Sequence, residues 1–297
     1  SGHGTHRPWQ DSLTAGGWIG MSGDGQQTTR RLECMHWPDA SLALERSGST
    51  LVWPFGAFEQ HGPQLPLLTD ALFAERILDQ VLESLPATLP IWALPAQKIG
   101  FSPEHRGFPG TLSLSAELLI RLVREVGKQL AAQGVQRLVL FNAHGGQIGL
   151  LQTAARELAA ETPSMAVLPC FLWSGVPGLE SLVPADELAH GLHAGLAETS
   201  LMLALEPSLV GEQRPLDGDH VSEAAAARPP EGWSLEGPAP LAWFTADLSQ
   251  SGVVGDSRGA DAKLGHQLET ALVAHWQSLF RSLLASSWPP RGNRRRV

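Results

Sequence analysis

Five side chains able to bind a metal ion stand in four short segments of this 297-residue chain. They are Glu59 and His61 in Glu-Gln-His-Gly, Asp70 nine residues further on, His144 in Asn-Ala-His-Gly-Gly, and Glu198 in Glu-Thr-Ser. Carboxylates and imidazoles without thiolates suit Zn, Mn or Fe in hydrolytic sites, whereas structural zinc usually recruits cysteine. The residue types therefore favour a metal-dependent hydrolase.

The spacing of the first three residues lets their side chains meet. Glu59 and His61 are two positions apart, so both side chains leave an extended segment on the same side. Asp70 opens a predicted helix behind Thr69, a candidate N-cap, and can face back toward that segment. The ordinary alternative for Asp70 is to complement the positive end of the helix dipole.

His144 and Glu198 lie at positions where a functional side chain is expected. His144 stands between a predicted strand and Gly145-Gly146, where the chain can turn sharply and leave the imidazole uncovered. Glu198 lies in an otherwise apolar segment, so its carboxylate is either exposed or buried beside a cation. Taken singly, a histidine is more often a surface or core residue than a ligand.

The number of carboxylates indicates how many ions the site would hold. Glu59, Asp70 and Glu198 bring three negative charges, and two divalent ions with one bound hydroxide would balance them. A single ion would leave the site anionic unless Glu198 is protonated and acts as an acid or base. The charge count favours two ions bridged by Asp70, and the one-ion alternative stays open.

Elements of alternating type must position these residues. Apolar runs predict strands at 51–55, 91–94, 138–141 and 165–172, and amphipathic runs predict helices at 70–85, 115–133, 147–160, 195–205 and 260–284. We therefore expect an α/β fold, a three-layer α/β/α sandwich with a mostly parallel central sheet. Ligands of such sheets bind at the carboxyl ends of the strands. The residues expected there are Glu59, His61, Ser102, His105, His144 and Trp173.

The remaining segments carry no predicted chemistry. A single domain is expected over 34–290, since 43% apolar residues can form a full core. The polar segment 1–33 is expected to be disordered or foreign to the native fold, and the Arg-rich segment 291–297 to be a solvated tail. The segment 207–240, rich in Pro, Gly, Ala and Glu, is predicted to be a long excursion.

Charge and cysteine content exclude several classes of partner. A net charge of -9 disfavours nucleic acid or an anionic membrane, because such partners require an excess of Lys and Arg. Two cysteines, Cys34 and Cys170, do not make a disulfide framework. Neither a signal peptide nor a membrane-spanning run is evident. We expect a cytoplasmic protein.

Five ordered motifs resemble those of the creatininase (creatinine amidohydrolase) family. They are PFGAFEQHGPQLPLLTD at 54–70, HRGFPGT at 105–111, NAHGGQ at 142–147, HAGLAETS at 193–200 and GVVGD at 252–256. The set is specific, although each motif alone is weak. The resemblance implies an α/β/α, metal-dependent hydrolase of C–N bonds in small molecules, usually a homohexamer. It also implies that Glu59, Asp70 and His144 hold one ion, and His61, Asp70 and Glu198 the other.

The chain departs from creatininase itself at several positions. Creatininase carries a carboxylate two residues after the histidine matched by His144, where this chain has Gly146, so Glu198 is expected to supply the second ion's carboxylate. Gln64, Gln147 and Leu196 stand where His, Asn and Glu are common. The pattern resembles other branches, which include formamide hydrolases of deazaflavin synthesis, a peptidase of peptide-cofactor maturation and a hydrolase of keto-inositols. Creatinine is therefore not the expected substrate.

Roles follow for the remaining candidates. His193 is the candidate proton shuttle and Glu198 a second catalytic group. Substrate contacts are expected from Ser102, His105, Gly145 and Trp173, with core packing as the alternative for Trp173. Glu104 and Arg106, on the same loop as His105, could simply be surface charges.

Two other classes of function stay open. One is a mononuclear lyase or isomerase, or a hydrolase, acting on a sugar- or inositol-like ketone, with Glu198 as a base rather than a ligand. The other is a non-catalytic assembly protein on the same scaffold.

Overall fold

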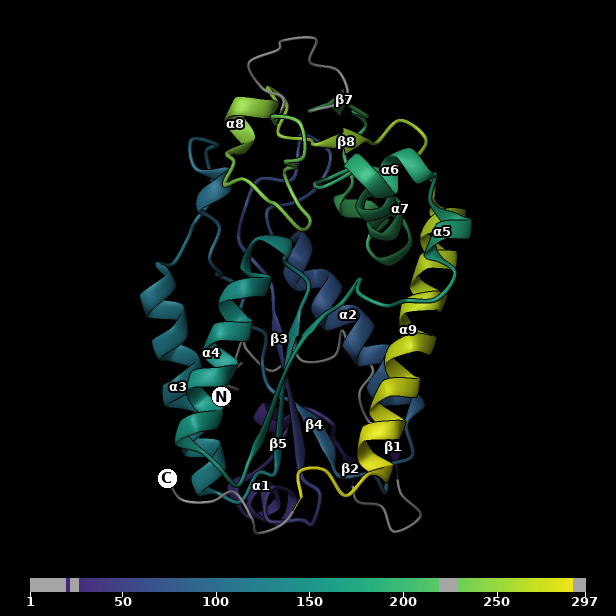
Figure 1. The fold of residues 1–297 in the computed structure, drawn as a ribbon. Coiled ribbons are helices and arrows are strands. Elements are labelled where there is room, and N and C mark those ends of the chain that lie inside the picture. Colours follow the sequence, from purple (N-terminus) through teal and green to yellow (C-terminus); the bar gives the residue numbers. More distant parts are fainter. Residues whose placement is uncertain (1–19, 22–26, 219–228, 291–297) are drawn as a thin grey trace, which may run out of the picture.

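The computed structural model describes residues 20–21, 27–218 and 229–290, and from Thr29 onward it gives the side chains of these ranges. The predicted tail at 291–297 and most of the segment 1–28 lie outside the described residues. The centre of the fold is a sheet of four parallel strands in the order β4-β3-β5-β6 (Figure 1). These strands are β3 (Thr50–Phe55), β4 (Ile91–Ala93), β5 (Arg137–Asn142) and β6 (Ala166–Phe171).

Helices cover both faces of this sheet, as the alternation of strands and helices predicts. The helices are α1 (Trp37–Leu44), α2 (Thr69–Ser84), α3 (Ala116–Ala132), α4 (Ile148–Glu161) and α9 (Ala262–Ala285). In Figure 1, α3 and α4 lie on one side of the sheet, and α2 and α9 on the other. The predicted three-layer α/β/α sandwich is confirmed.

Alternating side chains of the two central strands fill two separate cores. Val52, Val139 and Phe141 point to one face, where they pack with apolar residues of α2 and α9. Leu51 and Leu138 point to the opposite face, against α1, α3 and α4. Because both faces of each strand are apolar, the strands read as continuous hydrophobic runs.

The start of α2 and of α4 differs slightly from the prediction. Thr69 is the first helical residue and not the N-cap, and its hydroxyl donates to the Pro66 carbonyl at 2.7 Å. A 3-10 turn, η3 (Gly145–Gln147), precedes α4, so the helix begins one residue later than predicted. At both helix starts a loop carbonyl accepts from a backbone N–H where no side chain caps the helix, with Pro66 accepting from Thr69 at 3.2 Å and His144 from Gln147 at 3.4 Å.

Residues just before the expected domain start pack against the sheet. The Arg30 guanidinium donates to the carbonyls of Leu89 and Ile91 at 2.7 and 2.9 Å. Arg31 pairs with Asp79 of α2 at 2.7 Å. The expectation that the segment 1–33 stands outside the domain therefore does not extend to Arg30 and Arg31.

Short elements gather beyond the carboxyl end of the sheet (Figure 1). They are η2 (Pro103–His105), α5 (Leu179–Leu182), α6 (Ala185–His190), α7 (Leu196–Leu205), η4 (Pro207–Leu209), α8 (Thr245–Leu248), and the paired strands β7 (Leu216–Asp217) and β8 (Gly255–Asp256). Before the sheet, β1 (Gly20–Met21) pairs with β2 (Gln27–Thr28), and η1 (Leu32–Cys34) precedes α1. The described parts of 207–240 are largely irregular, as predicted. Among the described residues, no helix is both long and apolar enough to cross a membrane.

Candidate metal centre

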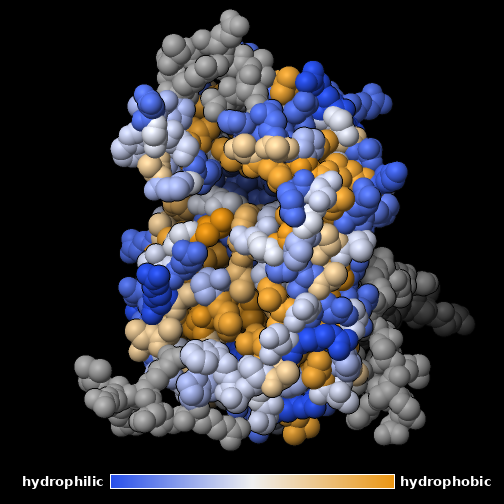
Figure 2. All heavy atoms as spheres, turned by 45° about the vertical axis from the view of Figure 1, so that its right-hand side comes forward, coloured by the Kyte–Doolittle hydropathy of each residue, from blue (hydrophilic) through white to orange (hydrophobic). Residues whose placement is uncertain are grey.

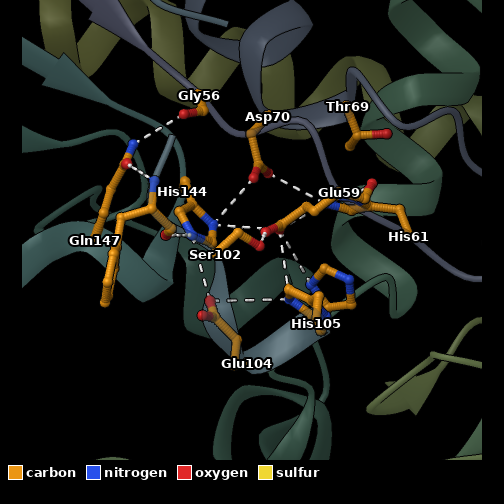
Figure 3. A network of polar contacts seen from close by, with 12 residues as sticks. Gly56, Glu59, His61, Thr69, Asp70, Ser102, Glu104, His105, His144 and Gln147 are labelled. Carbon is orange, nitrogen blue, oxygen red and sulfur yellow. Dashed lines mark hydrogen bonds and ion pairs between the residues drawn. The ribbon is translucent and has the colours of Figure 1, made fainter. Parts of the chain in front are cut away.

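The predicted ligands converge at the carboxyl edge of the sheet (Figure 3). Glu59 and His61 come from the loop after β3, Asp70 from the first turn of α2, and His144 from the turn after β5. The close packing of α2 on β3 helps to bring them together, since a Cβ at Gly56 would overlap the backbone of Ala71. All four side chains are buried.

Glu59, Asp70 and His144 form the first group of donors. His144 Nδ1 lies 3.2 Å from Glu59 Oε1 and 3.2 Å from Asp70 Oδ2. These three atoms are near enough to one another to share one cation. This is the group that the resemblance implies for one ion.

His61, Asp70 and Glu198 form the second group, in which Glu198 comes from the first turn of α7. His61 Nε2 lies 3.2 Å from Asp70 Oδ1. The donor atoms of the three residues lie within 4.8 Å of one another. Asp70 thus turns one carboxylate oxygen toward each group, which is the geometry of a bridging ligand.

Two buried oxygens at the junction of the groups support the fit of a cation. Among the described residues, neither Glu59 Oε1 nor Asp70 Oδ2 accepts a hydrogen bond of regular geometry. A buried polar atom without a partner is costly, and a carboxylate oxygen is more costly than most. The donor set of carboxylates and imidazoles also matches the preferences of Zn, Mn and Fe.

Side chains behind the first group hold it in place. Ser102 donates its hydroxyl to Glu59 Oε2. Asn142 clamps the backbone of His144, accepting from its N–H at 3.0 Å and donating to its carbonyl at 2.7 Å. Such partners fix the orientation of ligands and usually affect metal affinity.

Gln147 joins the three loops that follow β3, β4 and β5. Its side-chain amide donates to the Gly56 carbonyl at 3.0 Å and to Asn142 Oδ1 at 2.9 Å, and its oxygen accepts from Phe101 N–H at 3.1 Å. Gln147 was noted in the sequence only as a departure from the family pattern. Its role depends on contacts between distant loops, for which the sequence carries no local signal.

The second group depends on the segment that leads into α7. Ala194 has a φ of 54°, a strained value for a residue other than glycine. Its N–H donates to Glu198 Oε2 at 2.6 Å. Glu187 of α6 holds the start of α7, since its carboxylate accepts from the N–H groups of Leu196 and Asp256 at 2.8 and 3.0 Å.

The buried carboxylates make the site anionic, and they raise the pKa values of two histidines among them. Burial alone would lower the pKa of His61, but Asp70, Glu198 and Glu59 raise it to about 9. Despite burial, the pKa of His144 is raised well above its usual value by Glu59, Asp70 and Glu104. Burial raises the pKa of Glu198 to about 7. Cations that bind here would displace these protons.

Asp70 and His193 shift in the opposite direction. Burial would raise the pKa of Asp70, but His61 and His144 hold it well below its ordinary value. Burial and the neighbouring rings of His105 and His61 hold the pKa of His193 well below its usual range. His193 is therefore neutral at pH 7, with Nδ1 at 3.9 Å from Glu59 Oε1.

The candidate substrate contacts lie in three different surroundings. Ser102 and His105 face the centre, with His105 Nε2 at 3.5 Å from Glu59 Oε1. Gly145 is exposed, and an added Cβ would meet no atom within 4 Å, so open space adjoins its backbone. Trp173 packs edge-on against Phe73, with ring centroids 6.2 Å apart, and contacts the hydrophobic core. Contact with substrate stays a prediction for each of them.

Glu104, for which the sequence left a surface position open, faces the site. Its Oε1 lies 3.3 Å from His144 Nε2, and a Cβ at Gly146 would overlap its carboxylate (Figure 3). Glu104 therefore fills the space beside Gly146, where the family resemblance implies a carboxylate. The adjacent His105 was a signal that could have pointed to it.

Comparison with known proteins places the chain in a family. The sequence profile described as Creatininase: Creatinine amidohydrolase matches residues 33–280. The chain therefore belongs to the creatininase family. It is a hydrolase of this family and has an α/β/α fold. Its relatives include the mycofactocin precursor peptide peptidase of Mycobacterium tuberculosis, 34% identical over 78% of this chain and 85% of the relative.

Other relatives are less similar. The creatinine amidohydrolase of Pseudomonas putida is 30% identical over 61% of this chain and 74% of that protein. Two solved creatininase structures, one named for Mn and one for a Zn–Zn form, each match with a TM-score of 0.69 and 24% identity, covering 86% of this chain and 99% and 98% of theirs. These structures support the fold.

Proposed function

We propose that this protein is a metal-dependent hydrolase with two divalent ions, and that it cleaves an amide bond in a peptide substrate. The observation that carries the proposal is the position of Asp70. Its two oxygens lie 3.2 Å from His61 Nε2 and 3.2 Å from His144 Nδ1, in two different donor groups. A carboxylate so placed can bridge two cations and is poorly placed to serve one alone.

The charge of the site also supports two ions. Glu104 joins Glu59, Asp70 and Glu198 around the donor groups, so four carboxylates bring four negative charges. Two divalent ions with one bound hydroxide would leave a net charge of about -1, whereas one ion with a hydroxide would leave about -3. The sequence count of three carboxylates omitted Glu104, and the fourth strengthens the argument for two ions over one.

The chemistry of such a centre is hydrolysis of a carbonyl compound. Zn, Mn or Fe bound by Glu59, Asp70, His144, His61 and Glu198 would lower the pKa of water and polarise the substrate carbonyl. His193, neutral because its pKa is lowered, can accept a proton on Nδ1 and pass it to the leaving nitrogen. Glu198, with a pKa raised to about 7, is placed to ligate or to exchange a proton near neutral pH.

A peptide is the substrate class best supported by the comparisons. The relatives named as mycofactocin precursor peptide peptidases match at 31% to 34% identity over 78% to 85% of this chain, whereas the creatinine amidohydrolase matches at 30% over 61% of it. Gly146 lacks the carboxylate of creatininase, and its backbone is exposed beside the open space at Gly145. Location in the cytoplasm and assembly as a homohexamer remain parts of the proposal.

The test is metal analysis followed by a substrate comparison. Protein purified without chelator is expected to hold two ions per chain and to cleave short peptides faster than creatinine or formamides. One ion per chain with turnover of an inositol-like ketone would favour the mononuclear alternative. Substoichiometric metal with no turnover of any amide would favour a non-catalytic role.

A further inference from the structure

Four imidazoles surround one carboxylate oxygen. Which nitrogen of each ring carries the proton decides whether that ring can bind a cation or only donate a hydrogen bond. Glu59 Oε1 lies 3.2 Å from His144 Nδ1 and 3.5 Å from His105 Nε2. His61 Nε2 and His193 Nδ1 follow at 3.8 and 3.9 Å. A nitrogen with a lone pair can bind a cation or accept a proton, whereas an N–H can only donate.

Three of these rings turn their other nitrogen toward a backbone carbonyl. His61 Nδ1 lies 3.2 Å from the Glu59 carbonyl, His144 Nε2 lies 2.8 Å from the Phe101 carbonyl, and His193 Nε2 lies 2.7 Å from the Gln60 carbonyl. A carbonyl only accepts, so each of these outer nitrogens carries a proton. In the neutral rings the inner nitrogens therefore present lone pairs to the centre.

His105 is the reverse case. Its outer nitrogen, Nδ1, lies 2.9 Å from Gln60 Nε2 and 2.8 Å from Thr245 Oγ1. The Gln60 amide is oriented by two further contacts, because Oε1 accepts from the Gly62 N–H at 2.9 Å and Nε2 donates to the Gly252 carbonyl at 3.0 Å. An amide nitrogen only donates, so His105 Nδ1 accepts and the ring proton is on Nε2, facing the centre.

We propose that Gln60 is a positioning residue that makes His105 an N–H donor to the centre while His61, His144 and His193 present lone pairs. His105 then donates toward Glu59 and does not ligate an ion. This matters because Glu59, Glu104 and His105 are close enough to hold a cation by distance alone. Gln60 closes that group and leaves the donor groups without His105 open to ions, an assignment that rests on the proposed function.

The surroundings of Gln60 hold the amide in its orientation. Gln60 is buried between two candidate ligands in the sequence, and the Gly252 carbonyl that it contacts belongs to the loop 249–252. Asp217 fixes this loop, accepting from Ser249 Oγ at 2.9 Å and from Ser251 N–H at 2.9 Å. The orientation of one amide thus depends on an acid far away in the sequence.

The direct test is the tautomer of His105 by 15N NMR of histidine-labelled full-length protein loaded with zinc. His105→Asn assigns the signals by their loss. The wild-type protein is expected to show a protonated Nε2 and an unprotonated Nδ1. A protonated Nδ1 in the wild-type protein would overturn the proposal without any variant.

Variants then separate Gln60 from its neighbour. Gln60→Glu replaces a donor with an acceptor and is expected to move the proton of His105 from Nε2 to Nδ1. Thr245→Val is the matched control, because it removes the other contact of Nδ1 and should leave the tautomer unchanged. If Gln60→Glu does not fold, Gln60→Met serves in its place and is expected to release the tautomer to a mixture. A tautomer unchanged in every folded Gln60 variant would refute the role of Gln60.

Zinc content distinguishes this inference from the proposed function. His105→Asn is expected to keep the zinc content of the wild-type protein, whether that content is two ions or one. Loss of an ion in His105→Asn would show that His105 is a ligand and would overturn the inference. Failure of the wild-type protein to cleave peptides would instead reject the proposed function and leave the tautomer assignment intact.

Discussion

The two halves of the candidate centre are built differently. The Glu59–Asp70–His144 group comes from the segments that follow the two central strands and from the first turn of α2. Ser102, Asn142 and Phe101 hold it from behind. The His61–Asp70–Glu198 group takes its third member from α7. That member follows a strained residue, Ala194, and its local support is one N–H donor at 2.6 Å.

The first donor group is preorganised by the sheet, whereas the second forms only when the segment before α7 is held in place. A ligand on the end of a central strand inherits the rigidity of the sheet, whereas Glu198 depends on a segment that Glu187 must hold in place. The first group should therefore bind its ion more tightly.

The surface in Figure 2 is hollowed beneath the upper part of the molecule, where short elements cover the end of the sheet.

The largest effect is expected from the residue that both halves share. Asp70→Asn removes the charge that bridges the groups, so both ions should be lost and hydrolysis should fall by at least about 1,000-fold. Elemental analysis and initial rates measure the two effects. Asp79→Asn, on the same helix and outside the site, is the control. Full metal retention in Asp70→Asn would contradict the bridging role.

Glu198→Gln should break one half and spare the other. The ion held by Glu59, Asp70 and His144 should remain, so metal content should fall from two ions per chain to one and hydrolysis by about 100-fold or more. Elemental analysis after gel filtration gives the ratio. Retention of both ions with lost activity would make Glu198 a proton-transfer group and not a ligand.

Ser102→Ala should weaken the preorganised half without emptying it. Glu59 Oε2 loses its hydroxyl donor, and the loss of such a partner typically lowers metal affinity by about 10- to 100-fold. Competition with a chelator measures this change. Ser84→Ala, at the far end of α2 where the hydroxyl donates to the Val81 carbonyl at 2.6 Å, is the control. An equal loss of affinity for both ions would mean that the two halves are not independent.

The pH dependence of the second ion gives the smallest effect. Burial raises the pKa of Glu198 to about 7, and Asp70 with other carboxylates raises the pKa of His61 to about 9. Binding must displace the His61 proton below pH 9 and also the Glu198 proton below pH 7. Affinity for the second ion should therefore fall about tenfold per pH unit between 9 and 7 and more steeply below 7.

Calorimetric zinc titrations at several pH values measure this slope. Asp79→Asn is again informative, because burial raises the pKa of Asp79 to about 6 at a place outside the centre. The break near pH 7 should persist in Asp79→Asn. A slope that does not steepen below pH 7 would show that Glu198 is not displaced from a proton when the ion binds.

Much of the fold followed from the sequence because its signals are local. Apolar runs as short as Leu51–Phe55 indicate buried strands, and their alternation with amphipathic helices predicts a parallel sheet covered on both faces. Glu59, His61, Asp70 and His144 were also found locally, since their motifs stand where strands end or helices begin. Thr69 was misassigned as a cap because capping depends on the path of the preceding loop.

Only the tertiary structure decided the contacts between segments that are distant in sequence. The sequence determined which residues could bind metal and at which edge of the sheet they lie. It could not give the position of Glu104 beside Gly146, the turn of each oxygen of Asp70 toward a different histidine, or the hydrogen bond from Gln60 to His105. Residue type sets what a side chain can donate or accept, and only the packing of loops fixes which partner it meets.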